Sequence, residues 1–109
     1  MPLRDQMRKG TTKMLILRLL TERPMYGYEV SQELRKRSEG YFDLKEGLLY
    51  PALHELAHAG YVTSEWREAG PARRRKYYLI TDAGRASLTE QAEAWRSFIG
   101  RLLPLLDEG

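Results

Sequence analysis

Apolar residues recur at helical spacing in three stretches of the first sixty positions, and this periodicity predicts three helices. The first is expected over residues 7–20, after which a proline ends it. The second is expected over residues 26–37 and ends in three cations, which suit the negative end of the helix dipole. The third is expected over residues 47–59. Because Pro51 lacks an N–H group, this helix should start late, near Leu48, or irregularly.

After residue 60 the pattern changes from helical spacing to alternation. Residues 61–66 and 76–80 are rich in β-branched and aromatic residues, which predicts two strands. The loop between them, residues 67–75, contains a Gly-Pro pair and four arginines. The two strands are therefore expected to form a β-hairpin around a basic loop, and Thr81 should cap a helix that follows.

Apolar residues in this last helix step alternately by four and three positions, which is the spacing of a coiled-coil seam. Pro104 removes a helical hydrogen bond, so the regular part should end near Leu103. The helix either lies on its own domain or pairs with a second subunit. The rest of the chain already has a three-helix core to fill, which favours the second subunit. The positions expected at the dimer interface are Leu88, Ala92, Trp95, Ile99, Leu102, Leu103 and Leu106.

The composition excludes several classes of protein. The 109 residues contain no cysteine, which rules out a disulfide framework, a zinc finger and a cysteine nucleophile. His54 and His58 have the spacing of two ligands of one metal, but no further ligand set accompanies them, so exposed polar residues are the better interpretation and no metal site is predicted. No serine stands in a catalytic motif, so neither an enzyme nor a cofactor is predicted. Without a membrane-length apolar run or a signal-peptide pattern, the cytoplasm is the expected location.

The net charge of +3 is concentrated in two basic islands. Residues 1–20 hold five basic residues and one acidic residue, and residues 66–76 hold the same numbers, so each island carries +4. Such islands suggest a surface for a polyanion.

Three helices followed by a hairpin predict a mainly α fold with a small β-hairpin. This is a winged helix-turn-helix plus a C-terminal dimerisation helix. Residues 1–81 would form the DNA-binding domain and residues 82–109 the dimerisation helix.

Three motifs occur in order along the chain and resemble those of the PadR family of transcriptional regulators. Residues 24–30 resemble the hGYE element of the second helix, and residues 46–56 with Gly60 resemble the G-x-LYPxLxxLexxG recognition helix. Residues 74–81 resemble the RRKYYxLT wing strand, and Gly84 matches the glycine that follows it. The resemblance covers about residues 10–105. The single long C-terminal helix is similar to that of the shorter of the two PadR size classes.

The resemblance implies that the third helix reads DNA and that the hairpin contacts the DNA backbone. Tyr50 is then a DNA contact or a buried aromatic residue, and Tyr28 is a backbone contact through its hydroxyl or a core residue. Lys45 is a phosphate or base contact or a solvated lysine. Arg75 and Lys76 alternate in their strand, so only one of them should face DNA. The residues expected to contact DNA are Tyr28, Lys45, Gly47, Leu48, Tyr50, His54, Arg73, Arg74 and Lys76.

A tryptophan in the last helix resembles the feature by which small, multidrug-binding PadR members hold flat, often cationic drugs between two symmetry-related rings. Trp95 either binds such a ligand or simply fills the dimer core. The residues expected to line this ligand site are Met7, Met14, Trp95 and Ile99.

The predicted function is that of a homodimeric regulator, most simply a repressor, which binds an inverted-repeat operator in double-stranded DNA. A small aromatic or hydrophobic effector would release it. The family often has Thr or Ser where Leu48 stands, and His54 and Glu55 replace a common basic residue, so the operator sequence is not implied. The alternative is a winged-helix module that binds a protein and has no operator.

Overall fold

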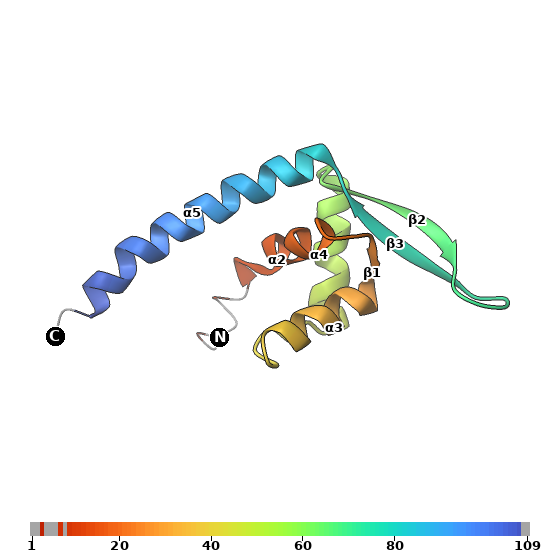
Figure 1. Ribbon diagram of the computed structural model, residues 1–109, viewed down its shortest axis with the longest axis horizontal. Coiled ribbons are helices and arrows are strands. Elements are labelled where there is room, and N and C mark those ends of the chain that lie inside the picture. The colour runs from red at the N-terminus through yellow and green to blue at the C-terminus, as the bar shows by residue number, and fades with distance from the viewer. Residues whose placement is uncertain (1–2, 4–6, 8, 108–109) are drawn as a thin grey trace.

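The computed structural model describes residues 3, 7 and 9–107. Figure 1 shows a central body of helices, from which a hairpin and one long helix point to opposite sides. The arrangement confirms the predicted fold class, a mainly α winged helix-turn-helix with a small sheet. The elements are α2 (Thr12–Leu20), β1 (Met25–Tyr26), α3 (Gly27–Arg37), α4 (Glu46–His58), β2 (Val62–Glu68), β3 (Arg74–Ile80) and α5 (Asp82–Leu106).

The predicted apolar faces of α2, α3 and α4 meet in one core, which the base of the sheet closes. Ile16 and Leu17 of α2, Val30 of α3 and Leu53 of α4 are completely buried there. Because the sheet contributes Met25, Val62 and Tyr78 to the same core, the base of the hairpin is fixed to the helices.

The sheet has three antiparallel strands in the order β1-β3-β2, so β2 is an edge strand. The sequence did not predict β1, since two residues are too few to show alternation. The loop predicted at residues 67–75 was too long. Arg67 pairs with Arg75 and Glu68 with Arg74 in the β-ladder, which leaves only residues 69–73 to form the turn.

The prediction of a continuous helix over residues 7–20 was wrong, although residue 8 lies outside the described part of the chain. Gly10 and Thr11 form a turn, and α2 begins at Thr12. Glycine costs about 1 kcal/mol in a helix interior. A Cβ at Gly10 would also lie 3.4 Å from the Trp95 ring, so the turn packs closely against α5.

Two prolines had less effect on their helices than the late start near Leu48 and the end near Leu103 assumed. α4 begins at Glu46 despite Pro51, and α5 continues to Leu106 despite Pro104. In both helices the residue four positions before the proline, whose carbonyl loses its N–H donor, is an exposed glycine. Water can therefore reach the freed carbonyl.

The long helix α5 is anchored at its N-terminal end and then extends away from the helical core. As predicted, Thr81 caps it, since its side chain accepts a hydrogen bond of 3.0 Å from the Gly84 N–H. Gly84 is the only buried residue of this 25-residue helix. The radius of gyration is 15.7 Å, whereas a compact chain of this length would have about 13 Å.

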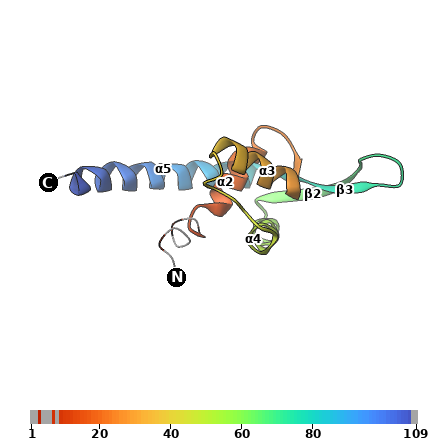
Figure 2. The same ribbon diagram turned by 90° about the horizontal axis from the view of Figure 1, so that it is seen from below.

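Seen from below in Figure 2, α5 and the hairpin extend along one axis while α4 is viewed nearly end-on beside the base of the hairpin. Within the described residues no helix is both long enough and apolar enough to cross a membrane.

Candidate nucleic-acid interface

The start of α4 is an open helix N-terminus. No side chain caps it, and the Lys45 carbonyl accepts from the N–H groups of both Leu48 and Leu49 at 2.9 Å. Helix N-termini present unpaired N–H groups and the positive end of the dipole, which suits a phosphate. Lys45 is well exposed beside this end and pairs with Asp43 at 3.1 Å. Gly47 has open space around it.

Tyr28 stands at the start of α3 with a hydroxyl that can donate. Its side chain is 52% exposed, so it is a surface residue and not a core residue. The Gln32 Nε2 donates to the Tyr28 hydroxyl oxygen at 2.5 Å. A phenol that accepts this bond keeps its own hydrogen for another acceptor, such as a phosphate oxygen.

Tyr50 of α4 lies against the start of α3 and is only partly covered there. A Cβ at Gly27 would be 3.0 Å from the Tyr50 ring and 3.1 Å from its hydroxyl oxygen. The glycine of the GYE element is therefore needed so that this ring can approach. Tyr50 remains 46% exposed, so it braces α3 with one side and presents the other to solvent.

The hairpin, or wing, has two faces with different chemistry. The ladder pairs Trp66 with Lys76 and Arg67 with Arg75, so these pairs alternate between the faces. Lys76 lines a hollow together with Tyr50 and His54 of α4, which defines the α4-side face of the wing. Arg75 alternates with Lys76 and lies over the Tyr26 ring, but it also borders a groove together with Lys76.

One cation of the wing, Arg67, is paired within the chain. Arg67 forms an ion pair of 2.5 Å with Glu65, and its guanidinium lies 4.8 Å from the centroid of the Tyr77 ring. Arg75 lies 4.4 Å from the Tyr26 ring. No ion pair within the described residues involves Arg73, Arg74, Arg75 or Lys76, and Arg74 and Lys76 also lie near rings, 5.6 Å from Trp66 and 5.7 Å from Tyr78. The cations of the wing other than Arg67 are therefore available to an external anion.

A groove joins this face of the wing to the starts of α3 and α4. No carboxylate is found among the described residues that line it, whereas five aromatic rings and three cations are. Burial raises the pKa of the Tyr78 phenol in its floor, which keeps that group uncharged. The lining residues are Tyr26, Gly27, Tyr28, Tyr50, Trp66, Arg74, Arg75, Lys76 and Tyr78.

The structure thus brings five of the predicted DNA contacts to this groove and the hollow beside it. The other four lie nearby on two sides. Lys45 is at the open end of α4, and Gly47 and Leu48 border a separate hollow with Lys9 and Lys13 of the N-terminal region. Arg73 is at the tip of the wing. The five residues gathered together are Tyr28, Tyr50, His54, Arg74 and Lys76.

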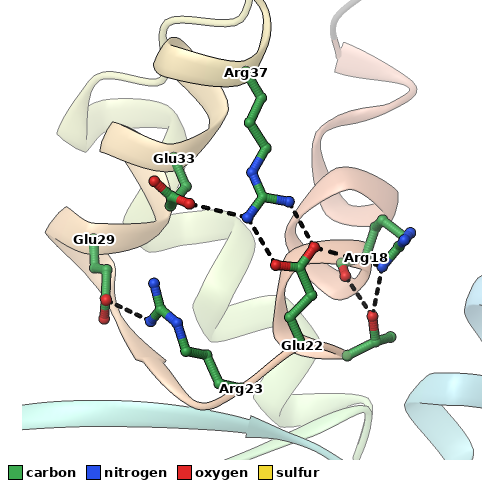
Figure 3. A network of polar contacts seen from close by, with 7 residues as sticks. Arg18, Glu22, Arg23, Glu29, Glu33 and Arg37 are labelled. Atoms are coloured by element: carbon green, nitrogen blue, oxygen red, sulfur yellow. Dashed lines mark hydrogen bonds and ion pairs between the residues drawn. The ribbon is translucent and has the colours of Figure 1, made fainter.

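An ionic network fixes α3 relative to the end of α2 (Figure 3). Arg37 of α3 donates to Glu22 at 2.5 Å and to Glu33 at 2.9 Å. The hydrogen bond from Arg37 lowers the pKa of the Glu22 carboxyl. Arg23 pairs with Glu29 of the GYE element at 2.5 Å. This network holds the helix that carries Tyr28.

The far half of α5 exposes large apolar side chains. Trp95 packs edge-to-face on Phe98 with ring centroids 5.7 Å apart, and Ala94 completes a shallow apolar hollow there. Leu88 instead packs against the core of its own chain. The sequence reasoning passed over Phe98, which is 55% exposed, since it falls between two positions of the seam. The exposed residues are Phe98, Ile99, Leu102, Leu103, Leu105 and Leu106.

Sequence reasoning also left Trp66 without a place in the interface. The alternation of β2 could have shown on which face of the hairpin Trp66 lies, because residues 64 and 66 share one face.

The two histidines do not form part of a metal site, since no group of three potential ligands occurs within the described residues.

Comparison with known proteins identifies the family. The model of the transcriptional regulator PadR-like family matches residues 16–90, which include α3, α4 and the whole wing. This chain belongs to the PadR-like family. The resemblance inferred from the three motifs is thereby confirmed, and members of this family are transcriptional regulators, not enzymes.

Individual relatives are similar to this chain in sequence or in fold over most of its length. Transcriptional regulator Rv3488 of Mycobacterium tuberculosis is 33% identical over 89 residues, which cover 82% of this chain and 79% of that protein. The negative transcriptional regulator PadR of Bacillus subtilis is 28% identical over 76 residues, which cover 70% of this chain and 42% of that protein. A PadR family transcriptional regulator from Eggerthella lenta has the same fold, with a TM-score of 0.83, 33% identity, and coverage of 95% of this chain and 88% of that one.

Proposed function

We propose that this PadR-family regulator is a homodimer that binds an inverted-repeat operator in double-stranded DNA and represses transcription. Residues 1–81 form the DNA-binding domain in this proposal, and residues 82–109 form the dimerisation helix. The observation that carries it is the groove beside α4, in which free cations and tyrosine hydroxyls surround a surface without any described carboxylate. Duplex DNA is the polyanion that fits a winged helix with this charge.

The proposed roles follow from position. The start of α4 enters the major groove, where Lys45, Gly47 and Leu48 face the bases or the nearest phosphates. Tyr28 and Tyr50 donate to the backbone beside it. Their hydroxyls fix orientation without reading sequence, as most backbone contacts do.

The wing and α4 would hold DNA from two sides. Lys76 and Arg74 approach the backbone on the α4-side face, and Arg73 reaches the flanking phosphates from the tip. His54 lies one helical turn after Tyr50 and borders the same hollow, where it can reach a base or a phosphate.

Dimerisation would follow from the apolar half of α5. Six large side chains there are exposed in one chain, and soluble proteins rarely leave such a surface uncovered. A second copy of α5 related by a twofold axis would cover it and would present two α4 helices to half-sites about 34 Å apart. Repression is supported by the name of the Bacillus subtilis relative, a negative transcriptional regulator.

The test is a mobility shift with the DNA upstream of the gene, repeated over a salt series. Several Lys and Arg contacts predict that binding weakens steeply as salt rises. Absence of binding to this DNA and to random duplex at low salt would instead support a winged-helix module that binds a protein.

A second candidate function, effector binding near Trp95, is favoured by the shallow apolar hollow beside that ring. A flat aromatic cation would stack between the two copies of Trp95 across the dimer axis, with Ile99 and the flexible Met7 and Met14 at its rim. Binding there would change the angle between the two α5 helices and so the spacing of the α4 helices. Coupling of roughly 1–3 kcal/mol is enough for such release from DNA.

Titration with a planar dye such as an acridine, followed by tryptophan fluorescence, tests this site. The quenching should disappear in Trp95→Ala. Quenching that persists undiminished in that variant would place the dye elsewhere.

A further inference from the structure

Trp66 is a large aromatic residue that the fold itself does not use. It lies on the edge strand β2 and is 57% exposed. The guanidinium of Arg74 lies 5.6 Å from the centroid of the Trp66 ring. An uncovered tryptophan on an edge strand invites unwanted association, so an occupant for this surface is expected.

The surroundings of Trp66 indicate the chemistry of that occupant. The indole lines the same groove as Tyr28, Tyr50 and Lys76, and no described carboxylate borders it. Lys76 is the direct cross-strand partner of Trp66. An apolar ring flanked by two cations matches a nucleotide of the DNA backbone, in which an anionic phosphate adjoins an apolar sugar.

A second copy of the chain is a poorer occupant. The exposed apolar residues of α5 lie at the end of the molecule opposite the wing (Figure 1). The cations around Trp66 also meet no acidic residue among those described in the hollow of α5, which are Ala94, Trp95 and Phe98.

We propose that Trp66 is a direct DNA contact, whose indole packs on a deoxyribose of the strand that Arg74 and Lys76 hold by its phosphates. The proposal rests on the proposed DNA-binding function. It makes the contact independent of sequence, because every nucleotide carries the same sugar. The contact is also apolar, so its formation releases no counterion from the DNA.

The competing role for Trp66 is to position Arg74, which lies over its ring. The two roles differ in their salt dependence. Loss of a phosphate contact lowers the slope of log K against log salt by about 0.9. Loss of a sugar contact lowers affinity at every salt concentration and leaves the slope unchanged.

Because the chain has two tryptophans, each can be followed alone. Trp95→Phe leaves Trp66 as the reporter, and Trp66→Phe leaves Trp95 as the matched control. Acrylamide quenching of each variant is measured with and without a random-sequence 30-base-pair duplex at low salt, after fluorescence anisotropy with labelled duplex shows that it binds. We expect the duplex to lower the quenching constant of Trp66 several-fold and to leave that of Trp95 unchanged.

Affinity measurements complete the test. Trp66→Ala should bind random duplex and upstream DNA about tenfold more weakly, a change of about 1.4 kcal/mol, with an unchanged salt slope. Trp66→Phe should retain most of the affinity, since a smaller ring still packs on the sugar. Far-ultraviolet circular dichroism checks that the wing is intact.

Three outcomes would overturn the proposal, and they can be told apart. Failure of the unsubstituted protein to bind any duplex would overturn the proposed function as well. Binding without protection of Trp66 would overturn this inference alone. A salt slope that falls in Trp66→Ala as it does in Arg74→Ala would show that Trp66 positions the arginine and does not itself touch DNA.

Discussion

Two surfaces of this chain expose large apolar side chains, and they differ in what surrounds those side chains. Beside α4, the rings of Tyr28, Tyr50 and Trp66 alternate with the cations Arg74 and Lys76. On the far half of α5, the exposed large apolar residues are mostly aliphatic, and the described residues that line the hollow among them are Ala94, Trp95 and Phe98.

The difference shows that exposed apolar area does not by itself identify a partner. Rings that carry hydroxyls or lie near cations can pack on a sugar while neighbouring groups hold its phosphates. An aliphatic stripe without charges is covered best by another apolar surface, here a second α5. The first surface fits DNA, and the second fits a copy of the chain.

The largest effect is expected at the joint between the two surfaces, where α5 starts. A Cβ at Gly84 would lie 2.2 Å from the Tyr61 carbonyl oxygen and 2.8 Å from Ile80. Backbone cannot move out of the way cheaply, so Gly84→Ala should lower the free energy of unfolding by about 3 kcal/mol or more. Urea denaturation measures this change.

Gly100→Ala is the matched control for the joint, since nothing lies within 4 Å of its Cβ position. It should be neutral or stabilise α5 by up to about 1 kcal/mol. Equal losses in the two variants would mean that α5 is not anchored through Gly84.

The next largest effect is expected on dimerisation, which depends on the α5 surface and not on the wing. Ile99→Glu would bury an unpaired charge in the proposed dimer interface and should weaken dimerisation by on the order of 3 kcal/mol, roughly a hundredfold in dissociation constant. Sedimentation velocity at micromolar concentration measures it. Thr89→Glu adds the same charge at an exposed polar position of α5 and should remain dimeric. A dimer that survives Ile99→Glu would place the interface elsewhere.

The fold was predictable because local signals agreed with the tertiary arrangement. Helical spacing, a change of period and the cap at Thr81 placed four of the seven described elements within one or two residues. The errors arose where a tertiary or solvent effect outweighed local propensity. Pro51 and Pro104 lie within helices because the carbonyls they free belong to exposed glycines.

The candidate site was less predictable because its residues gather through tertiary contacts. Sequence motifs indicated Tyr50 and Lys76, but not that Gly27 lets the Tyr50 ring approach α3. The alternation of β2 and β3 separated Arg75 from Lys76. It did not show that Arg67 pairs with Glu65, or that Arg75 lies over Tyr26 beside the groove, which only the folded wing reveals.

The unpaired cations at the wing tip give a prediction of their own. Replacing Arg73 and Arg74 by alanine should weaken binding to random and upstream duplex alike and reduce the salt slope by up to about 2, since two phosphate contacts are lost. The matched pair, Arg35→Ala with Lys36→Ala, removes the same charge from exposed positions in the last turn of α3 and should leave the slope nearly unchanged. Binding by mobility shift between low and moderate salt checks both. Equal slopes for the two double variants would contradict an α4-side docking of DNA.

The smallest effect is expected at Glu22, which lies in neither surface but braces the helix that carries Tyr28. Arg37 lowers the pKa of Glu22 below its ordinary value of 4.5 through a hydrogen bond. A carboxyl whose folded-state pKa is lowered contributes its stability above the unfolded pKa and loses it as pH falls through the folded pKa. Glu22 should therefore stabilise the fold at pH 7, and this contribution should fade below about pH 4.5.

Glu22→Gln should lower the melting temperature slightly at pH 7, by less than the other variants because the pair is exposed and screened. The difference from the unsubstituted protein should shrink as pH falls below 4.5, since protonation removes the same charge. Glu90→Gln on the exposed face of α5 has no described ion pair to lose and serves as the control. A deficit of Glu22→Gln that stayed constant from pH 7 to pH 3 would mean that the substitution disturbs packing and not the ion pair. The salt slope of DNA binding should be unchanged in this variant, because bracing α3 from the α2 side contacts no phosphate.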